Sequence, residues 1–270
     1  MNWIYPVTLS LYSLSILGYF IDFLQYNRKV NRMAFWLLSI VWVLQTIFFI
    51  VRALELERLP LFTPFEGFYF YAWLVLTLSL VINYFFRVDF LVFFTNVIGF
   101  SMLTYSFVAL DDRVPESLQH MFASELLMTH IAIILISYVA FTLSFVCQLM
   151  YVIQYQMLKR KVWSKHLFRF SSLSKLDSLS YVLILIGWPL LLIGLILGFT
   201  WASTQMTTVP LFDSKVMLSL AVLAVYALYL YRRVVRMARG YHVTLIGIAG
   251  FFCLLVNYLI SGKYSSFHIW

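Results

Sequence analysis

Charged residues are scarce in this chain of 270 residues, and their scarcity excludes a soluble globular protein. Asp, Glu, Lys and Arg make up 11% of the residues, whereas soluble domains contain about 25%. Hydrophobic residues reach 63%, more than a core surrounded by water accommodates. We therefore expect an all-α, polytopic integral membrane protein, because lipid is the solvent in which such a composition is stable.

Cysteines and the motifs of common catalytic sites are also rare. Cys147 and Cys253 lie in apolar runs without a CxxC spacing, so neither a disulfide framework nor thiol exchange is predicted. The chain contains no GxGxxG, GxxxxGK or HExxH segment, which excludes those phosphate-binding loops and that zinc site. No charged residue lies near the middle of an apolar run, and this disfavours an ion-coupled transporter.

What the chain does have is a series of apolar runs. Crossing a bilayer as a helix takes roughly 20 residues, and about eight runs reach that length. They predict one integral membrane domain, 1–270, with spans at approximately 4–24, 33–51, 65–86, 90–110, 126–149, 180–200, 215–231 and 243–260. The fifth helix is predicted to continue to Leu158.

Basic residues predict the orientation of these spans. All but five of the 19 Lys and Arg residues lie in the loops that follow the first, third, fifth and seventh spans. The five on the opposite side are Arg52, Arg58, Arg113, Lys215 and Lys263. Because cytoplasmic loops are enriched in Lys and Arg, both termini are predicted to face outward from the cell membrane.

The five histidines are the candidates for binding a metal or cofactor. His130 lies about one turn inside the fifth span and His268 follows the eighth, so both are predicted near the outer face at similar depth. Neutral imidazole is a ligand of haem iron, and a site with two histidines needs them at one depth. A helix-end histidine is more often an interfacial hydrogen-bonding group, and spacing alone does not distinguish the two roles. His120 lies in an outer loop, whereas His166 and His242 lie in basic cytoplasmic loops.

The longest basic loop, KRKVWSKHLFRFSSLSK, combines six basic residues with Trp163, Leu167, Phe168 and Phe170. This composition is typical of positive-inside topology with an interfacial helix on anionic lipid. It also fits a membrane adaptor whose cytoplasmic loops bind a soluble protein partner. The two interpretations stay open.

Several stretches together resemble one family. In LLMTHIAIILISYVAF, residues His130, Ser137 and Tyr138 stand at the H-x(6)-SY spacing of the CcsA/CcmC-type cytochrome c assembly proteins. GFTWASTQMTTVPLFDSK is similar to the family's tryptophan-rich loop and the start of the next span, with Trp201, Asp213 and Lys215 at matching positions.

Two further stretches extend the resemblance from Pro64 to the end of the chain. TPFEGFYFYAWLVL is similar to the family's Y-E-S-L-x-F-x-x-W stretch through Glu66, Phe70 and Trp73. GIAGFFCLLVNYLISGKYSSFHIW is similar to its closing span and terminal G-L-H-S-Y.

The resemblance implies a haem-handling protein that presents haem at the outer face. His130 and His268 would be the axial ligands, and Trp201 would lie against the porphyrin. Arg113 or Lys215 would pair with a propionate, because cation–carboxylate hydrogen bonds favour such contacts.

The chain departs from the family pattern between Trp201 and Asp213, where it has no further tryptophan. This degenerate loop, the number of spans and the length resemble the HemX branch. That branch implies a non-enzymatic membrane protein associated with haem biosynthesis and with control of the level of glutamyl-tRNA reductase. A haem-delivery component of cytochrome c assembly is the second interpretation.

Overall fold

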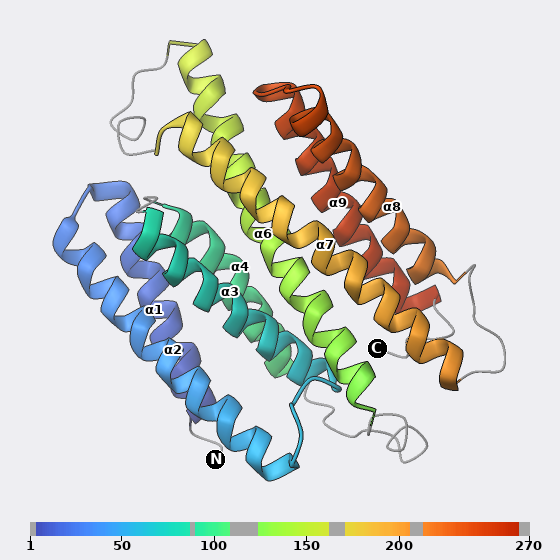
Figure 1. The fold of residues 1–270 in the computed structure, drawn as a ribbon. Helices are drawn as coiled ribbons and strands as arrows, with labels where there is room; N and C mark the ends of the chain where they lie inside the picture. The colour runs from blue at the N-terminus through green and yellow to red at the C-terminus, as the bar shows by residue number, and fades with distance from the viewer. Residues whose placement is uncertain (1–3, 87–89, 109–123, 162–170, 206–212, 265–270) are drawn as a thin grey trace. The chain divides into compact units, whose positions relative to one another are not determined.

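The computed structural model describes residues 4–86, 90–108, 124–161, 171–205 and 213–264, and every regular element within them is a helix (Figure 1). The chain divides into two compact units, residues 1–114 and 115–270. Each has its own helix pairs and buried core, and the single membrane domain over 1–270 stays a prediction.

Unit 1 contains four helices joined into two hairpins. They are α1 (Ile4–Gln25), α2 (Arg28–Leu56), α3 (Pro64–Phe86) and α4 (Leu91–Val108). Helix α1 packs on α2 and α3 packs on α4, while α1–α4 and α2–α3 contacts join the hairpins. Asn27 caps the start of α2, because its side-chain oxygen accepts from the backbone N–H of Lys29 and of Val30.

Unit 2 repeats this order of pairing, and its first, second and fourth helices are longer than those of unit 1. Its elements are α6 (Glu125–Lys159), α7 (Leu173–Gln205), α8 (Ser214–Leu230), the π-helix η1 (Tyr231–Val235) and α9 (Tyr241–Tyr264). Helix α6 pairs with α7 and α8 with α9, and α6–α9 and α7–α8 contacts complete the unit.

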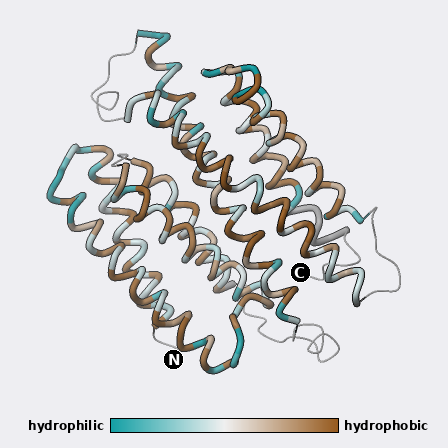
Figure 2. Tube along the Cα trace, viewed as in Figure 1, coloured by the Kyte–Doolittle hydropathy of each residue, from teal (hydrophilic) through white to brown (hydrophobic). Residues whose placement is uncertain are grey.

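These helices confirm the polytopic membrane fold. Seven are long and apolar enough to cross a membrane, and the segment Leu91–Phe107 is a shorter apolar helix. Hydrophobic residues predominate along the helices, and the most hydrophilic residues lie mainly near the helix ends (Figure 2). Trp36 and Leu54, for example, are 63% and 73% exposed, as suits a surface facing lipid.

The helices extend beyond the predicted spans mainly at their polar ends. Helix α6 ends at Lys159, which confirms the predicted extension of the fifth span. Helix α7 begins at Leu173, seven residues before its predicted apolar run, because helical hydrogen bonding continues through polar residues that hydropathy leaves out.

A buried asparagine links three helices in each unit. In unit 1, Asn96 on α4 accepts from the Tyr12 hydroxyl on α1 at 2.7 Å and donates to Ser79 on α3 at 2.8 Å. In unit 2, Asn257 on α9 donates to Tyr138 on α6 at 3.4 Å and to Ser219 on α8 at 3.0 Å. The first, third and fourth helices of each unit are therefore joined by the same residue types, a correspondence that the sequence did not reveal.

Candidate functional site

The candidate site begins at a close contact between α6 and α7. Three glycines lie along one face of α7, and a Cβ at any of them would collide with a side chain of α6. Gly187 faces Phe141, Gly194 faces Ile134 and Gly198 faces His130. Gly194 and Gly198 form a GxxxG pair, a spacing that lets membrane helices approach closely.

His130 lies in the notch that Gly198 leaves open. Its ring nitrogen Nδ1 is 2.6 Å from the backbone carbonyl oxygen of Gly194. A carbonyl oxygen only accepts, so Nδ1 carries the hydrogen and Nε2 keeps its lone pair in the neutral ring. The side chain is partly exposed, and it therefore presents a potential ligand atom near the start of α6.

Trp201 follows Gly198 by three residues and Gly194 by seven, which places it on the same face of α7. It is 6% exposed, so its ring is buried within the part of the chain that the structure describes. The predicted aromatic neighbour of the site thus lies one helical turn beyond the notch that holds His130.

Lys215 lies in the first turn of α8, at the same end of unit 2 as His130. Asp213 begins this helix, because its carboxylate accepts the backbone N–H of Lys215 at 2.9 Å. The Lys215 side chain lies within electrostatic range of His130. The structure therefore brings a cation, an imidazole and a face of α7 to one end of unit 2.

Two predicted members of the site, Arg113 and His268, lie outside the described residues, as do His120 and His166. The remaining histidine, His242, lies at the other end of unit 2 near the start of α9. Its ring meets that of Tyr241 edge to face at 5.7 Å between centroids. His242 and His130 therefore lie at opposite ends of unit 2, as the sequence analysis predicts.

The chemistry of the described residues suits one axial ligand of haem better than an enclosed metal ion. Among them, no three His, Cys, Asp or Glu residues gather closely enough to hold a metal. Haem needs only one or two axial ligands from the protein, because the porphyrin supplies the other four. A metal-binding histidine commonly donates its second ring N–H to a carbonyl, as His130 does to Gly194.

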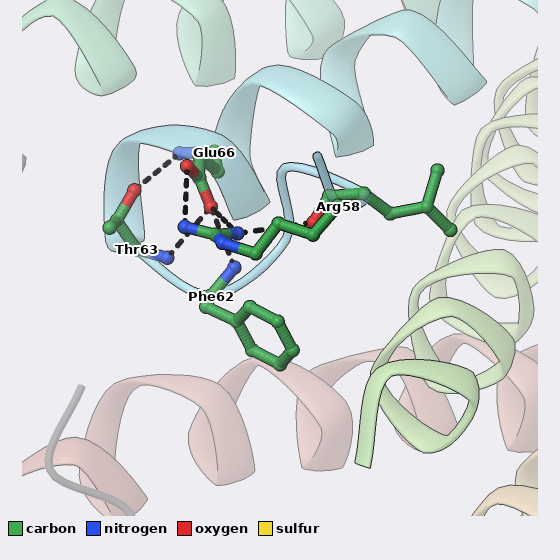
Figure 3. A network of polar contacts seen from close by, with 5 residues as sticks. Arg58, Phe62, Thr63 and Glu66 are labelled. Carbon is green, nitrogen blue, oxygen red and sulfur yellow. Dashed lines mark hydrogen bonds and ion pairs between the residues drawn. The ribbon is translucent and has the colours of Figure 1, made fainter. Parts of the chain in front are cut away.

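Glu66, a residue of the family-like stretch in unit 1, has a structural role instead (Figure 3). Its carboxylate pairs with both terminal nitrogens of Arg58, at 3.0 and 3.2 Å. It also accepts the backbone N–H groups of Phe62 and Thr63, while the Thr63 hydroxyl accepts the N–H of Glu66. This capping box starts α3 and occupies the carboxylate, so it leaves Glu66 poorly suited to bind a ligand.

The sequence interpretation missed the glycines that position His130. These glycines do not form phosphate-binding loops; Gly198 leaves space for a side chain from the neighbouring helix. The spacing Gly194-xxx-Gly198 inside an apolar run indicates a close helix contact and is visible in the sequence.

The comparisons with known proteins agree with the extent of the resemblance. The profile of the family described as Cytochrome C assembly protein matches residues 61–268. The chain is 47% identical to Protein HemX of Bacillus subtilis (strain 168), over 97% of this chain and 95% of that protein. It is 43% identical to Protein HemX of Brevibacillus brevis, over 100% and 98%, and 24% identical to the cytochrome c biogenesis protein CcsA of Guillardia theta, over 79% and 77%. The chain therefore belongs to the cytochrome c assembly protein family and is a HemX-like, multi-pass membrane protein.

Proposed function

We propose that this protein is a non-enzymatic haem-binding protein of the plasma membrane that acts in haem biosynthesis and its regulation. The observation that carries the proposal is the hydrogen bond between His130 Nδ1 and the Gly194 carbonyl, which leaves Nε2 as the ligand atom. Family membership adds that related proteins include a cytochrome c biogenesis protein.

The residues around His130 would each have a separate task. The Gly194 carbonyl holds the ring tautomer and orientation, and Gly198 provides the space for the ring. Trp201 supplies an apolar aromatic surface, and the Lys215 ammonium is suited to pair with a propionate. Bound haem would supply a redox-active iron with a characteristic visible spectrum. His268 and Arg113 stay predictions for the second axial ligand and for another propionate contact.

The regulatory part of the proposal rests on occupancy. A site that binds the end product of a pathway is filled in proportion to the free concentration of that product. If haem and a cytoplasmic partner both bind one state of the protein more tightly than another, the binding of haem changes the affinity for that partner. We propose that this partner is glutamyl-tRNA reductase and that its level falls or rises with the occupancy of the site.

The test of haem binding is the absorption spectrum of the protein purified in detergent from haem-replete cells. We expect a low-spin haem spectrum in the wild type, and a high-spin or haem-free protein after His130→Ala. His268→Ala should have a similar effect, whereas His242→Ala should keep the wild-type spectrum. A wild type that takes up no haem, or a His130→Ala protein with an unchanged spectrum, would refute the assignment.

The test of regulation compares the cellular level of glutamyl-tRNA reductase in strains that lack the protein, express it, or express His130→Ala at equal amounts. We expect the wild type and the deletion to differ, and the variant to resemble the deletion. If the variant behaves as the wild type while it lacks haem, haem binding and regulation are separate functions.

A haem-delivery role in cytochrome c assembly is the second candidate, favoured by the profile match over residues 61–268. It predicts that deletion lowers the amount of covalently haem-bound cytochrome c, and that His130→Ala does the same. Unchanged cytochrome c in the deletion strain would leave the regulatory role as the better account.

A further inference from the structure

One face of α6 bonds to the backbone of α7 at regular intervals. Three side chains on this face bond to carbonyl oxygens of α7, and on both helices the bonded positions are seven residues apart. The pairs are His130 with Gly194 at 2.6 Å, Ser137 with Gly187 at 2.8 Å and Ser144 with Ser180 at 3.0 Å. Because seven residues make two helical turns, these bonds follow one line along an antiparallel pair and define a single register between the helices.

The glycines of α7 impose the same register through packing. Their contacts recur after seven and then four residues on both helices, with Gly187 against Phe141, Gly194 against Ile134 and Gly198 against His130. A shift of one turn, about 5.4 Å, would set Phe141 against Leu183 or Leu191. Since even a Cβ at Gly187 would lie 2.9 Å from the Phe141 ring, neither leucine leaves room for that ring.

Ser137 is the member of this face that follows His130. It lies seven residues away, about 10 Å along the helix axis, and it is fully buried. Serine hydroxyls in helices commonly bond to the carbonyl four residues earlier in the same helix, as those of Ser39 and Ser101 do. The Ser137 hydroxyl instead crosses to α7, so its bond depends on the position of the neighbouring helix.

Tyr138, the next residue, holds a different neighbour. Its hydroxyl accepts from the Asn257 amide of α9 at 3.4 Å, and the same amide donates to Ser219 of α8. Consecutive helical residues lie about 100° apart around the axis, which turns Ser137 toward α7 and Tyr138 toward α9. The H-x(6)-SY spacing therefore corresponds to contacts that hold α6 against two helices.

We propose that Ser137 is a positioning residue for His130. Its bond to the Gly187 carbonyl fixes the register in which the Gly194 carbonyl meets Nδ1 of the imidazole, so that the hydrogen stays on Nδ1 and the lone pair on Nε2. Ser137 lies two turns from the imidazole and acts through the register of the helices rather than by touching a ligand. The proposal deepens the haem-binding function proposed above, and only its haem readout rests on that function.

The first experiment observes the imidazole without haem. The full chain, labelled with ¹⁵N at histidine alone, is placed in lipid bilayers in alkaline buffer, where imidazoles are neutral. His130→Gln identifies the signals of His130. We expect the wild type to carry the hydrogen on Nδ1, and Ser137→Ala to lose part of this tautomer. A wild type with the hydrogen on Nε2 of His130 would overturn the proposal.

Ser144→Ala is the matched control. It also removes one buried bond from a serine hydroxyl to an α7 carbonyl, but it lies about 21 Å from His130 along the axis. We expect both variants to lower the thermal unfolding midpoint by similar amounts, and only Ser137→Ala to change the tautomer. If Ser137→Ala is destabilised as the control is but keeps the wild-type tautomer, Ser137 has a structural role alone and the proposal fails.

A second pair of variants isolates the hydroxyl if Ser137→Ala does not fold. Ser137→Thr and Ser137→Val add nearly the same volume, and only threonine keeps the donor. Ser137→Thr should retain the wild-type tautomer and Ser137→Val should not. Equal tautomer populations in the two would overturn the proposal.

The last measurement is the haem affinity of the purified protein, obtained by titration in detergent. Loss of an outer partner of a metal ligand commonly lowers affinity tenfold or more, so Ser137→Ala should weaken haem binding by about tenfold and Ser144→Ala should not. A wild type that shows the Nδ1 tautomer and binds no haem would refute the haem function and leave the positioning of the imidazole supported. A changed tautomer with unchanged haem affinity would overturn the link between Ser137 and the haem site.

Discussion

An ideal Cβ on Gly198 would lie 2.6 Å from Cε1 of the His130 imidazole, so the two residues fit together only because Gly198 has no side chain. The fit couples helix packing to the orientation of the ring. Whatever holds α6 and α7 together therefore also sets the direction in which His130 Nε2 points.

Substituting Gly198 tests this coupling. Gly198→Ala should push the imidazole from the Gly194 carbonyl and cost about 1–3 kcal/mol of stability through overpacking. We expect a lower thermal unfolding midpoint and, if haem is bound, a shifted absorption spectrum. Gly67→Ala is the matched control, because a Cβ there meets nothing within 4 Å and helix propensity favours Ala. Equal behaviour of the two variants would contradict the proposed notch.

The second prediction concerns the capping network of unit 1. Glu66→Ala removes the partner of Arg58 and of two backbone N–H groups at the start of α3, so we expect a loss of about 3–5 kcal/mol. The measurement is the unfolding midpoint in detergent. Glu55→Gln, at an exposed position in the last turn of α2, should leave the midpoint nearly unchanged. A Glu66→Ala protein as stable as the control would show that the network contributes little.

The third prediction compares the two buried asparagines. Asn96 is hydrogen-bonded through both amide atoms, whereas Oδ1 of Asn257 has no partner in the described part of the chain. Asn96→Leu should therefore destabilise its unit by about 1–2 kcal/mol, a value near the upper end for hydrogen bonds between membrane helices. Asn257→Leu should cost less. A larger effect at Asn257 would mean that its free oxygen has a partner outside the described residues, such as water or a ligand.

The fourth prediction tests the orientation, which was inferred from basic loops alone. With Cys147 and Cys253 replaced by Ala, new cysteines at Ser172 and Ser203 would mark the two ends of α7. An impermeant thiol reagent should label the Ser203→Cys protein in intact cells and the Ser172→Cys protein only after permeabilisation. The opposite result would reverse every inner and outer assignment.

The positions of the helices along the chain followed from hydropathy, because crossing a bilayer is a local requirement. Each run of about 20 apolar residues, such as the one that became α3, had to form a helix to satisfy its backbone in lipid. Asn27 and Asp213 could have been read as caps, since each precedes a helix and accepts a backbone N–H two residues ahead.

The identity of His130 as the leading candidate also came from the sequence, because a histidine near the end of an apolar run and its spacing to Ser137 and Tyr138 are visible without a structure. What the sequence lacked was a reason to prefer a ligand over an interfacial hydrogen-bonding group. The structure adds the partner of Nδ1, the Gly194 carbonyl 64 positions further along the chain, and haem binding at Nε2 stays a prediction.

Only the tertiary structure decided which residues meet. Hydropathy sums over neighbours in the chain, so it specifies that a segment spans the membrane but not how the helix is rotated about its axis. Rotation is set by contacts between helices: Gly198 against His130, Asp177 against Arg233, and Asn96 between Tyr12 and Ser79. Such pairs depend on close packing and on satisfying polar groups that lipid cannot solvate, and both are properties of two helices rather than of one.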